Sequence, residues 1–175
     1  MMAEMRILPV ERAIEWIRAW TELEWPITWE TAYAIRDRLG WVPAPDDGRF
    51  FVTELSVNGE EDGSINTFNG HCSGVYFPLS SRNLSVVVDE AWKVALRSTY
   101  DRCVTNLAGL YGVSKRSREH ARRVRTEWEL DSRITLSLAV SDKSASVTID
   151  SPKLTEINEW ELHYIEKYGE NYVED

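Results

Sequence analysis

The spacing of apolar and polar residues predicts a pair of helices near the N-terminus. In residues 9–24, apolar side chains recur at the 3.6-residue period of an amphipathic helix, and charged side chains occupy the opposite side. Pro26 ends this helix, because its ring cannot continue one. Thr28 can cap a second helix, which closes at Gly40, where a left-handed backbone conformation is needed.

The same periodicity predicts two further helices in the second half of the chain. After Asn83, apolar residues recur at three- and four-residue steps, and Gly112 stops the long helix that they form. Pro152 breaks the strand pattern before it, and Thr155 can cap a last helix. The apolar stripe of that last helix consists of Ile157, Trp160, Tyr164, Ile165 and Tyr168.

Five segments show the features of strands, above all the alternation of apolar and polar residues. They are residues 50–57, 75–80, 124–130, 133–140 and 145–150. Short turns join the last three, so hairpins and a largely antiparallel sheet are expected. We therefore predict an α+β fold with a mostly antiparallel sheet of about five strands covered by about four helices. Residues 1–175 form one domain in this prediction, and the acidic tail at 169–175 is expected to fray.

Composition narrows the classes of function. The net charge of −9 argues against nucleic acid as a partner, because that affinity comes mainly from cations on phosphates. No run approaches the roughly 20 apolar residues of a membrane span, and the N-terminus lacks the apolar core of a secretory signal. Cys72 and Cys103 are too few for a disulfide scaffold and are expected as reduced thiols. We therefore expect a cytoplasmic protein that binds neither nucleic acid nor a membrane.

A glycine-rich loop contains two patterns that bear on chemistry. Oxygen-bearing side chains from Asn58 to Asp62 follow the spacing of an EF-hand calcium loop, but Asn69 stands where that loop needs a bidentate glutamate. His71 and Cys72 are adjacent, and adjacent side chains on an extended chain point to opposite sides, so they are poorly placed for thiol catalysis. We therefore predict no metal site, no catalytic residue and no cofactor.

Residues 115–125 form a basic run. Six cations against one glutamate give the run a local charge of +5, and because the net charge is −9, the rest of the chain carries −14. A basic run can hold phosphate. The opposing charge of the rest of the chain and the lack of interleaved aromatic residues favour a solvated connection instead.

The C-terminal segment, residues 154–175, is acidic and contains regularly spaced tyrosines. Seven acids against Lys167 give it a net charge of −6, and a tyrosine recurs every four residues. Such a strip could occupy a basic cleft, because charge speeds the encounter and aromatic side chains provide adhesion; the alternative is a solvated helix face. Partner contacts are therefore expected at Glu60, Glu61 and Asp62 of the glycine-rich loop and at Glu166, Tyr168, Glu170 and Tyr172.

Five of the eight tryptophans lie in residues 15–41. Trp20 falls on the apolar side of the first helix, and Trp41 follows the closing glycine of the second, so both are expected in the core. Trp16, Trp25 and Trp29 are less strongly tied to the core by their positions. Their exposed edges form a possible secondary surface for a partner.

Two segments of the chain contain distinctive motifs. They are WPITWETAYAIRDRLGW (25–41) and TEWELDSRITLSLAVSDKSASVTIDSP (126–152), which together cover about a quarter of the chain. Their features are a tryptophan-marked entry into a helix that ends in LGW and a late tryptophan-bearing strand followed by two more. In these features the chain resembles a known family of small, acidic actinobacterial proteins. The genes of that family tend to lie near polymorphic toxins and type VII secretion loci, and its members are regarded as immunity proteins. Both motifs determine the fold, so no binding residue carries over.

The resemblance and the acidic charge together predict a toxin-neutralising immunity protein rather than an enzyme. Such a protein would bind a cognate toxin domain, with a basic cleft, in the cytoplasm of the producing cell and mask its active site. An acidic secretion chaperone, which holds an effector for export, is the alternative hypothesis. Its order of helices and strands would be similar, but it would grip an extended segment of its client.

Overall fold

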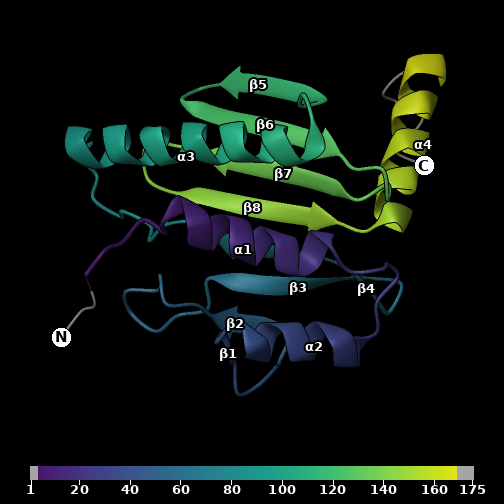
Figure 1. Cartoon of the computed structure of the whole chain (residues 1–175), viewed down its shortest axis with the longest axis horizontal. Helices are drawn as coiled ribbons and strands as arrows, with labels where there is room; N and C mark the ends of the chain where they lie inside the picture. Colours follow the sequence, from purple (N-terminus) through teal and green to yellow (C-terminus); the bar gives the residue numbers. More distant parts are fainter. Residues whose placement is uncertain (1–3, 169–175) are drawn as a thin grey trace.

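Three helices cover one face of an extended sheet, and a fourth lies at one end of the strands (Figure 1). The computed structural model describes residues 4–168, so the predicted acidic tail at 169–175 lies outside the described residues. The helices are α1 (Val10–Thr21), α2 (Trp29–Arg38), α3 (Glu90–Tyr111) and α4 (Pro152–Tyr168). The prediction of an α+β fold with about four helices is confirmed for the described part of the chain.

The predicted helix ends are largely confirmed. The Thr28 hydroxyl accepts a hydrogen bond from the Thr31 amide at 3.1 Å. Gly40 and Gly112 have φ values of 79° and 86°, the left-handed conformation that follows many helices. The predicted Thr155 cap is wrong.

The Ser151 hydroxyl caps α4 instead, by accepting a hydrogen bond from the Leu154 amide at 3.2 Å. Pro152 is therefore the first residue of the helix, and the strand pattern ends before it, as predicted. Proline fits this position because the amide it lacks would have no partner inside the helix. Thr155 lies one turn further on, where its hydroxyl donates back to the Ser151 carbonyl.

The sheet has eight strands among the described residues, so the prediction of about five is too low. All neighbouring strands are antiparallel, in the order β1-β2-β3-β4-β8-β7-β6-β5. The strands are β1 (Val42–Pro43), β2 (Phe50–Val52), β3 (Gly63–Phe68), β4 (His71–Pro78), β5 (Arg116–His120), β6 (Arg123–Glu129), β7 (Thr135–Val140) and β8 (Ala145–Asp150). Two four-stranded meanders therefore meet at the pairing of β4 with β8, and α3 connects them.

The three strands that the sequence did not reveal lack an apolar alternation. β1 has only two residues, and β3 lies inside the glycine-rich loop and consists mostly of polar and small residues. β5 lies in the basic run and forms the edge of the sheet, with four of its five residues exposed. An edge strand of charged residues is a known protection against pairing with other chains, and it carries no hydrophobic signal.

The face of the sheet under α1, α2 and α3 contains the core (Figure 1). Trp41 stacks on Phe51 of β2 with 4.4 Å between ring centroids, and Trp16 of α1 meets Trp41 edge-on at 5.1 Å. Trp20 is fully buried beside them, which confirms that Trp20 and Trp41 belong to the core. On α3, the Tyr100 hydroxyl lies 2.6 Å from the Thr126 hydroxyl of β6, so the third helix is fixed to the second meander.

Candidate functional site

The opposite face of the sheet carries mostly polar side chains. One row that crosses five strands in register consists of Ser64, Tyr76, Thr148, Ser137 and Glu127. Side chains of alternate residues on a strand point to opposite faces, so these residues face away from α1, α2 and α3. We call this surface the open face.

Only one described helix, α4, meets the open face, and it does so at one corner. The Thr155 hydroxyl of α4 lies 2.7 Å from the Thr135 hydroxyl of β7. Arg133 connects the same corner through ion pairs with Glu159 of α4 at 2.7 Å and Glu129 of β6 at 3.4 Å. Away from that corner, Tyr76 is exposed on this face, whereas Ser137 is buried.

A hollow of about 500 Å³ lies at the β2–β4 side of the open face. The loop at residues 55–62 forms one wall, and the segment at residues 80–84, with the β7–β8 turn, forms the other. Its apolar lining includes Phe50, Tyr76 and Leu84, with exposed fractions of 45%, 40% and 67%. Large apolar side chains are usually buried, so three that share one hollow mark it as a candidate contact surface.

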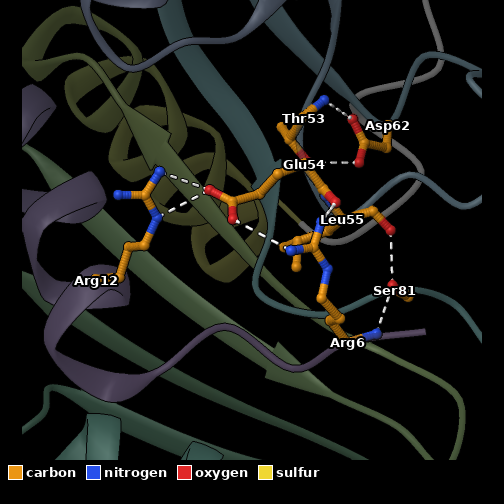
Figure 2. A network of polar contacts seen from close by, with 7 residues as sticks. All are labelled: Arg6, Arg12, Thr53, Glu54, Leu55, Asp62 and Ser81. Atoms are coloured by element: carbon orange, nitrogen blue, oxygen red, sulfur yellow. Dashed lines mark hydrogen bonds and ion pairs between the residues drawn. The ribbon is translucent and has the colours of Figure 1, made fainter. Parts of the chain in front are cut away.

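Asp62 holds the base of the loop at residues 55–62, which forms one wall of the hollow (Figure 2). The two oxygens of the Asp62 carboxylate accept hydrogen bonds from the Thr53 amide at 2.8 Å and the Thr53 hydroxyl at 2.6 Å. Burial raises the pKa of Asp62, although the hydrogen bonds from Thr53 oppose this shift. Asp62 lines the hollow, but its carboxylate is already engaged within the loop.

Contacts with the N-terminal segment hold the same loop from the other side (Figure 2). The Glu54 carboxylate forms ion pairs with Arg12 of α1 at 2.6 Å and with Arg6 at 3.7 Å, and Arg6 also donates to the Glu54 carbonyl. The Ser81 hydroxyl donates to the Leu55 carbonyl at 2.7 Å and accepts from the Arg6 amide at 2.9 Å. One wall of the hollow is thus tied directly to the other.

Glu60 and Glu61 of this loop are exposed and line the hollow. The Glu60 amide donates to the Asn58 side chain at 3.1 Å, and the Glu60 carbonyl accepts from Ser56 at 2.8 Å. These bonds fix the backbone of the loop. Neither the Glu60 nor the Glu61 carboxylate forms an ion pair within residues 4–168.

Among residues 4–168, the structure does not bring the predicted acidic loop and the predicted C-terminal strip together. The hollow is lined by Ser144 and Ala145 at the start of β8, whereas α4 leaves the end of that strand. Glu166 is exposed on α4, and Tyr168 is the last residue of the helix. Glu170 and Tyr172 lie outside the described residues. Their part in binding a partner stays a prediction.

Of the three tryptophans expected to form a secondary partner surface, Trp16 is buried in the structure. Trp16 has an exposed fraction of 1%, so the expectation that it presents an edge to a partner is wrong. Its ring is packed against Trp41 and Phe77 in the core. Trp25 and Trp29 are half-buried, and their indole nitrogens donate to backbone carbonyls of Trp20 and Gly70.

His71 and Cys72 occupy different environments, as their adjacency predicts. His71 is exposed, whereas Cys72 is buried, and burial raises the pKa of its thiol. Cys103 is also buried and unpaired, with its pKa raised by burial to about 11. Within residues 4–168, no group of three or more histidine, cysteine, aspartate or glutamate side chains could hold a metal ion.

The basic run forms the β5–β6 hairpin rather than an irregular connection. Ala121 and Arg122 form its two-residue turn with φ values of 48° and 67°, as hairpin turns of this length require. Arg118 and Arg125 pair across the two strands, and Arg125 belongs to the open face because it donates to Ser137 at 3.2 Å. The open face is therefore basic at the β5 edge and acidic at the loop of Glu60 and Glu61.

Asp150 is the last residue of β8 and lies near the corner of the open face that α4 meets. Its register partners are Gly74 of β4 and Thr135 of β7. Burial raises the pKa of the Asp150 carboxyl to about 6, a shift that Arg125 opposes and Glu127 reinforces. At neutral pH the Asp150 carboxylate is therefore charged in an environment that disfavours the charge, which lowers the free energy of unfolding.

Residues 11–151 match a protein family described as a family of unknown function (DUF6301). The chain belongs to this family. No curated protein and no solved structure matches it. No helix among residues 4–168 is long and apolar enough to cross a membrane.

The region shared with the DUF6301 family contains both walls of the hollow and the whole sheet. It ends at Ser151, immediately before α4, so Glu60 and Glu61 lie inside the match and Glu166 and Tyr168 lie outside it. The sequence alone did not reveal the exposed apolar residues of the hollow. Tyr76 could have been found, because it occupies the polar phase of a strand whose neighbours Val75 and Phe77 are apolar.

Proposed function

We propose that this chain is an immunity protein that binds a cognate toxin domain in the cytoplasm of the producing cell and masks its active-site cleft. The observation that carries the proposal is the hollow on the open face, where Glu60 and Glu61 form an acidic wall beside exposed Phe50 and Tyr76. Enzymes that act on nucleic acids or phosphates have basic clefts, so an acidic surface with aromatic anchors is complementary to them.

The construction of the acidic wall supports a preformed binding surface. Asp62, Glu54 and Ser81 anchor the loop at its base, so the tip loses little conformational freedom when a partner binds. Charges at the rim of an interface chiefly accelerate encounter, whereas buried aromatic side chains slow dissociation. The hollow provides both kinds of group within one surface.

Co-expression with the toxin domain encoded beside the gene tests this proposal. We expect the chain to restore growth of cells that produce the toxin domain and to bind the purified domain with nanomolar affinity. A folded chain that neither restores growth nor binds the domain at micromolar concentrations would contradict the proposal. Circular dichroism of the same preparation establishes that the chain is folded.

An acidic secretion chaperone is the second candidate, and one observation favours it. Between β4 and α3, Leu84, Val86 and Val87 expose large fractions of their apolar side chains. A chaperone that holds an extended client segment requires such a surface. Native mass spectrometry separates the two functions: a stable dimer that binds only unfolded or N-terminal parts of a partner indicates a chaperone, whereas a complex with the folded toxin domain indicates an immunity protein.

A further inference from the structure

Three highly exposed aliphatic side chains lie close together between β4 and α3. Leu84, Val86 and Val87 are exposed to 67%, 95% and 73%, and we call these three residues the aliphatic strip. Single exposed aliphatic residues are common on protein surfaces, but a cluster of them within four residues needs a reason.

Hydrogen bonds at both ends hold the strip in place. The Asn83 amide donates to the Lys143 carbonyl at 3.0 Å, and its side-chain oxygen accepts from the Ser85 amide at 3.0 Å. At the other end, the Asp89 carboxylate accepts from the Trp92 amide at 3.1 Å and caps α3. The strip is therefore presented by a segment that is fixed on both sides, rather than by a loose loop.

The strip continues directly into the hollow through Leu84, which belongs to both. Tyr76 forms part of the floor, and Glu60 and Glu61 stand on the opposite wall without an ion pair among the described residues. Arg82 is the cation that lines the same hollow. One surface thus combines an aliphatic end with an acidic end that has an aromatic side chain beside it.

We infer that the aliphatic strip and the hollow form one docking surface for a basic, amphipathic segment of a partner protein. Aliphatic side chains of the segment cover Leu84 and Val87, and an arginine or lysine enters the hollow between the acidic wall and Tyr76. This inference rests on the proposed function, because it specifies the chemistry of the toxin segment that the immunity protein binds.

The physical fit favours arginine or lysine for the hollow. The long stem of these side chains packs on apolar surface while the cationic head reaches acids. A cation above a tyrosine ring is attracted by the ring as well, and the attraction is greatest for a partly desolvated group. Two carboxylates, Glu60 and Glu61, exceed the single charge of Arg82, so the hollow keeps a net attraction for a cation.

A second copy of the chain fits this surface less well. A two-fold dimer repeats the same patch on both sides, so each acidic wall would meet only the charges that the patch itself contains. Arg82 is the cation that a second copy would bring from the hollow, and its own Glu60 and Glu61 would come with it. A basic segment satisfies the acidic wall without adding acids.

The first experiment compares two synthetic peptides on the full, isotopically labelled chain. The probe is an amphipathic peptide of roughly 12 residues in which leucine pairs alternate with arginine, and its control has citrulline, the neutral isostere, in place of arginine. We expect chemical-shift changes at residues 57–61, 76 and 82–87. We also expect the citrulline peptide to bind at least about ten-fold more weakly.

Matched variants assign the two ends of the surface. E60Q/E61Q is expected to weaken arginine-peptide binding about ten-fold, whereas E24Q/E30Q, which removes two exposed acids far from the hollow, is expected to leave it unchanged. L84S/V87S is expected to weaken binding of both peptides about ten-fold. V113S changes a valine that is 93% exposed beyond the other end of α3 and serves as its control.

Three outcomes would overturn the inference: equal affinity for both peptides, shift changes confined to other surfaces, or a dimer that L84S/V87S abolishes while the arginine peptide fails to bind. The last outcome would identify a second copy as the occupant.

Growth rescue separates this inference from the proposed function. If the wild-type chain protects cells and E60Q/E61Q/L84S/V87S protects equally, the docking surface is wrong and the function stands; if the wild-type chain does not protect, the function fails whatever the peptides show.

Discussion

The two faces of the sheet are built from different residue classes, although the same strands contribute to both. The face under α1, α2 and α3 buries Trp16, Trp41 and Phe77 in one aromatic cluster. The open face carries polar side chains such as Thr148 and the buried Ser137, together with the partly buried carboxyl of Asp150. The covered face is therefore committed to folding, and the open face retains groups that a partner can use.

Because of this difference, substitutions on the covered face are expected to change stability, and substitutions on the open face are expected to change binding. A side chain of the covered face has neighbours on every side, so removing it leaves a cavity. An exposed side chain of the open face, such as Tyr76, contacts solvent, and its removal changes the surface more than the packing. The following four predictions test that division, from the largest expected effect to the smallest.

Trp41→Ala is expected to lower the free energy of unfolding by about 4 kcal/mol, because it removes the ring that contacts Trp16, Phe51 and Phe77. Urea denaturation followed by circular dichroism measures the change. Trp160→Ala is the matched control, because Trp160 is 56% exposed on α4 and its loss is expected to cost less than about 0.5 kcal/mol. Similar losses for the two variants would contradict the division between covered and exposed aromatic residues.

Gly74→Ala is expected to lower the free energy of unfolding by about 2 kcal/mol. A β-carbon at residue 74 would lie 2.1 Å from the Ile149 carbonyl oxygen, so β4 and β8 would have to separate. Gly109→Ala, in the interior of α3 with open space around it, is expected to raise stability by up to about 1 kcal/mol. Thermal denaturation of both variants in parallel shows whether the signs differ; a stable Gly74→Ala variant would mean that the central strand pair tolerates separation.

Asp150→Asn is expected to stabilise the chain at pH 7 by about 1 kcal/mol, after allowance for solvent screening of this partly exposed group. The pKa of Asp150 is raised from 3.8 to about 6 in the folded chain, so the folded state holds the proton more tightly than the unfolded state. Stability from this group is present below about pH 4 and is lost as the pH rises through about 6. Urea midpoints between pH 4 and pH 8 should therefore diverge with rising pH; parallel curves for the two proteins would contradict the assignment.

Glu54→Gln is expected to lower the free energy of unfolding by only about 0.5 kcal/mol, because its ion pairs with Arg12 and Arg6 are partly exposed. The larger effect should be local: faster amide hydrogen exchange in the loop at residues 55–62, whose base Glu54 anchors. Glu30→Gln, at an exposed acid of α2 outside this network, is the control. Unchanged exchange in the loop would mean that the contacts of Asp62 and Ser81 hold it without Glu54.

The helices could be predicted from the sequence because each carries a complete local signal. The Thr28 cap, the closing Gly40 and the apolar stripe of the third helix all arise from neighbouring residues. Strands β3 and β5 could not be predicted, because strands of mostly polar residues acquire their conformation from hydrogen bonds with partner strands rather than from a local apolar pattern. The cap of α4 was misplaced for a related reason: Ser151 and Thr155 have the same chemistry, and only the pairing of β8 fixes where the strand ends.

The candidate site was predictable only in part. The exposed acids Glu60 and Glu61 follow from composition, since a loop of acidic residues and glycines has no reason to be buried. The hollow itself requires Phe50, Tyr76 and Leu84 to converge from separate segments, which depends on the register of β2, β3 and β4. The burial of Trp16 likewise depends on Trp41, which the intervening chain brings against it.

The strand order has a practical consequence for how the chain can be handled. Each meander is continuous in sequence, and the two halves of the sheet pair only through β4 and β8, with the strip segment and α3 as the connection. A backbone cut between Val86 and Val87 therefore yields two fragments, each with four consecutive strands and two helices. We expect the fragments to reassemble when produced together, as a split reporter whose signal depends on the pairing of β4 with β8 and on the packing of α1 against α3, where the Thr21 and Tyr111 hydroxyls share a hydrogen bond. Fused to two other proteins, the fragments would report whether those proteins meet in a living cell.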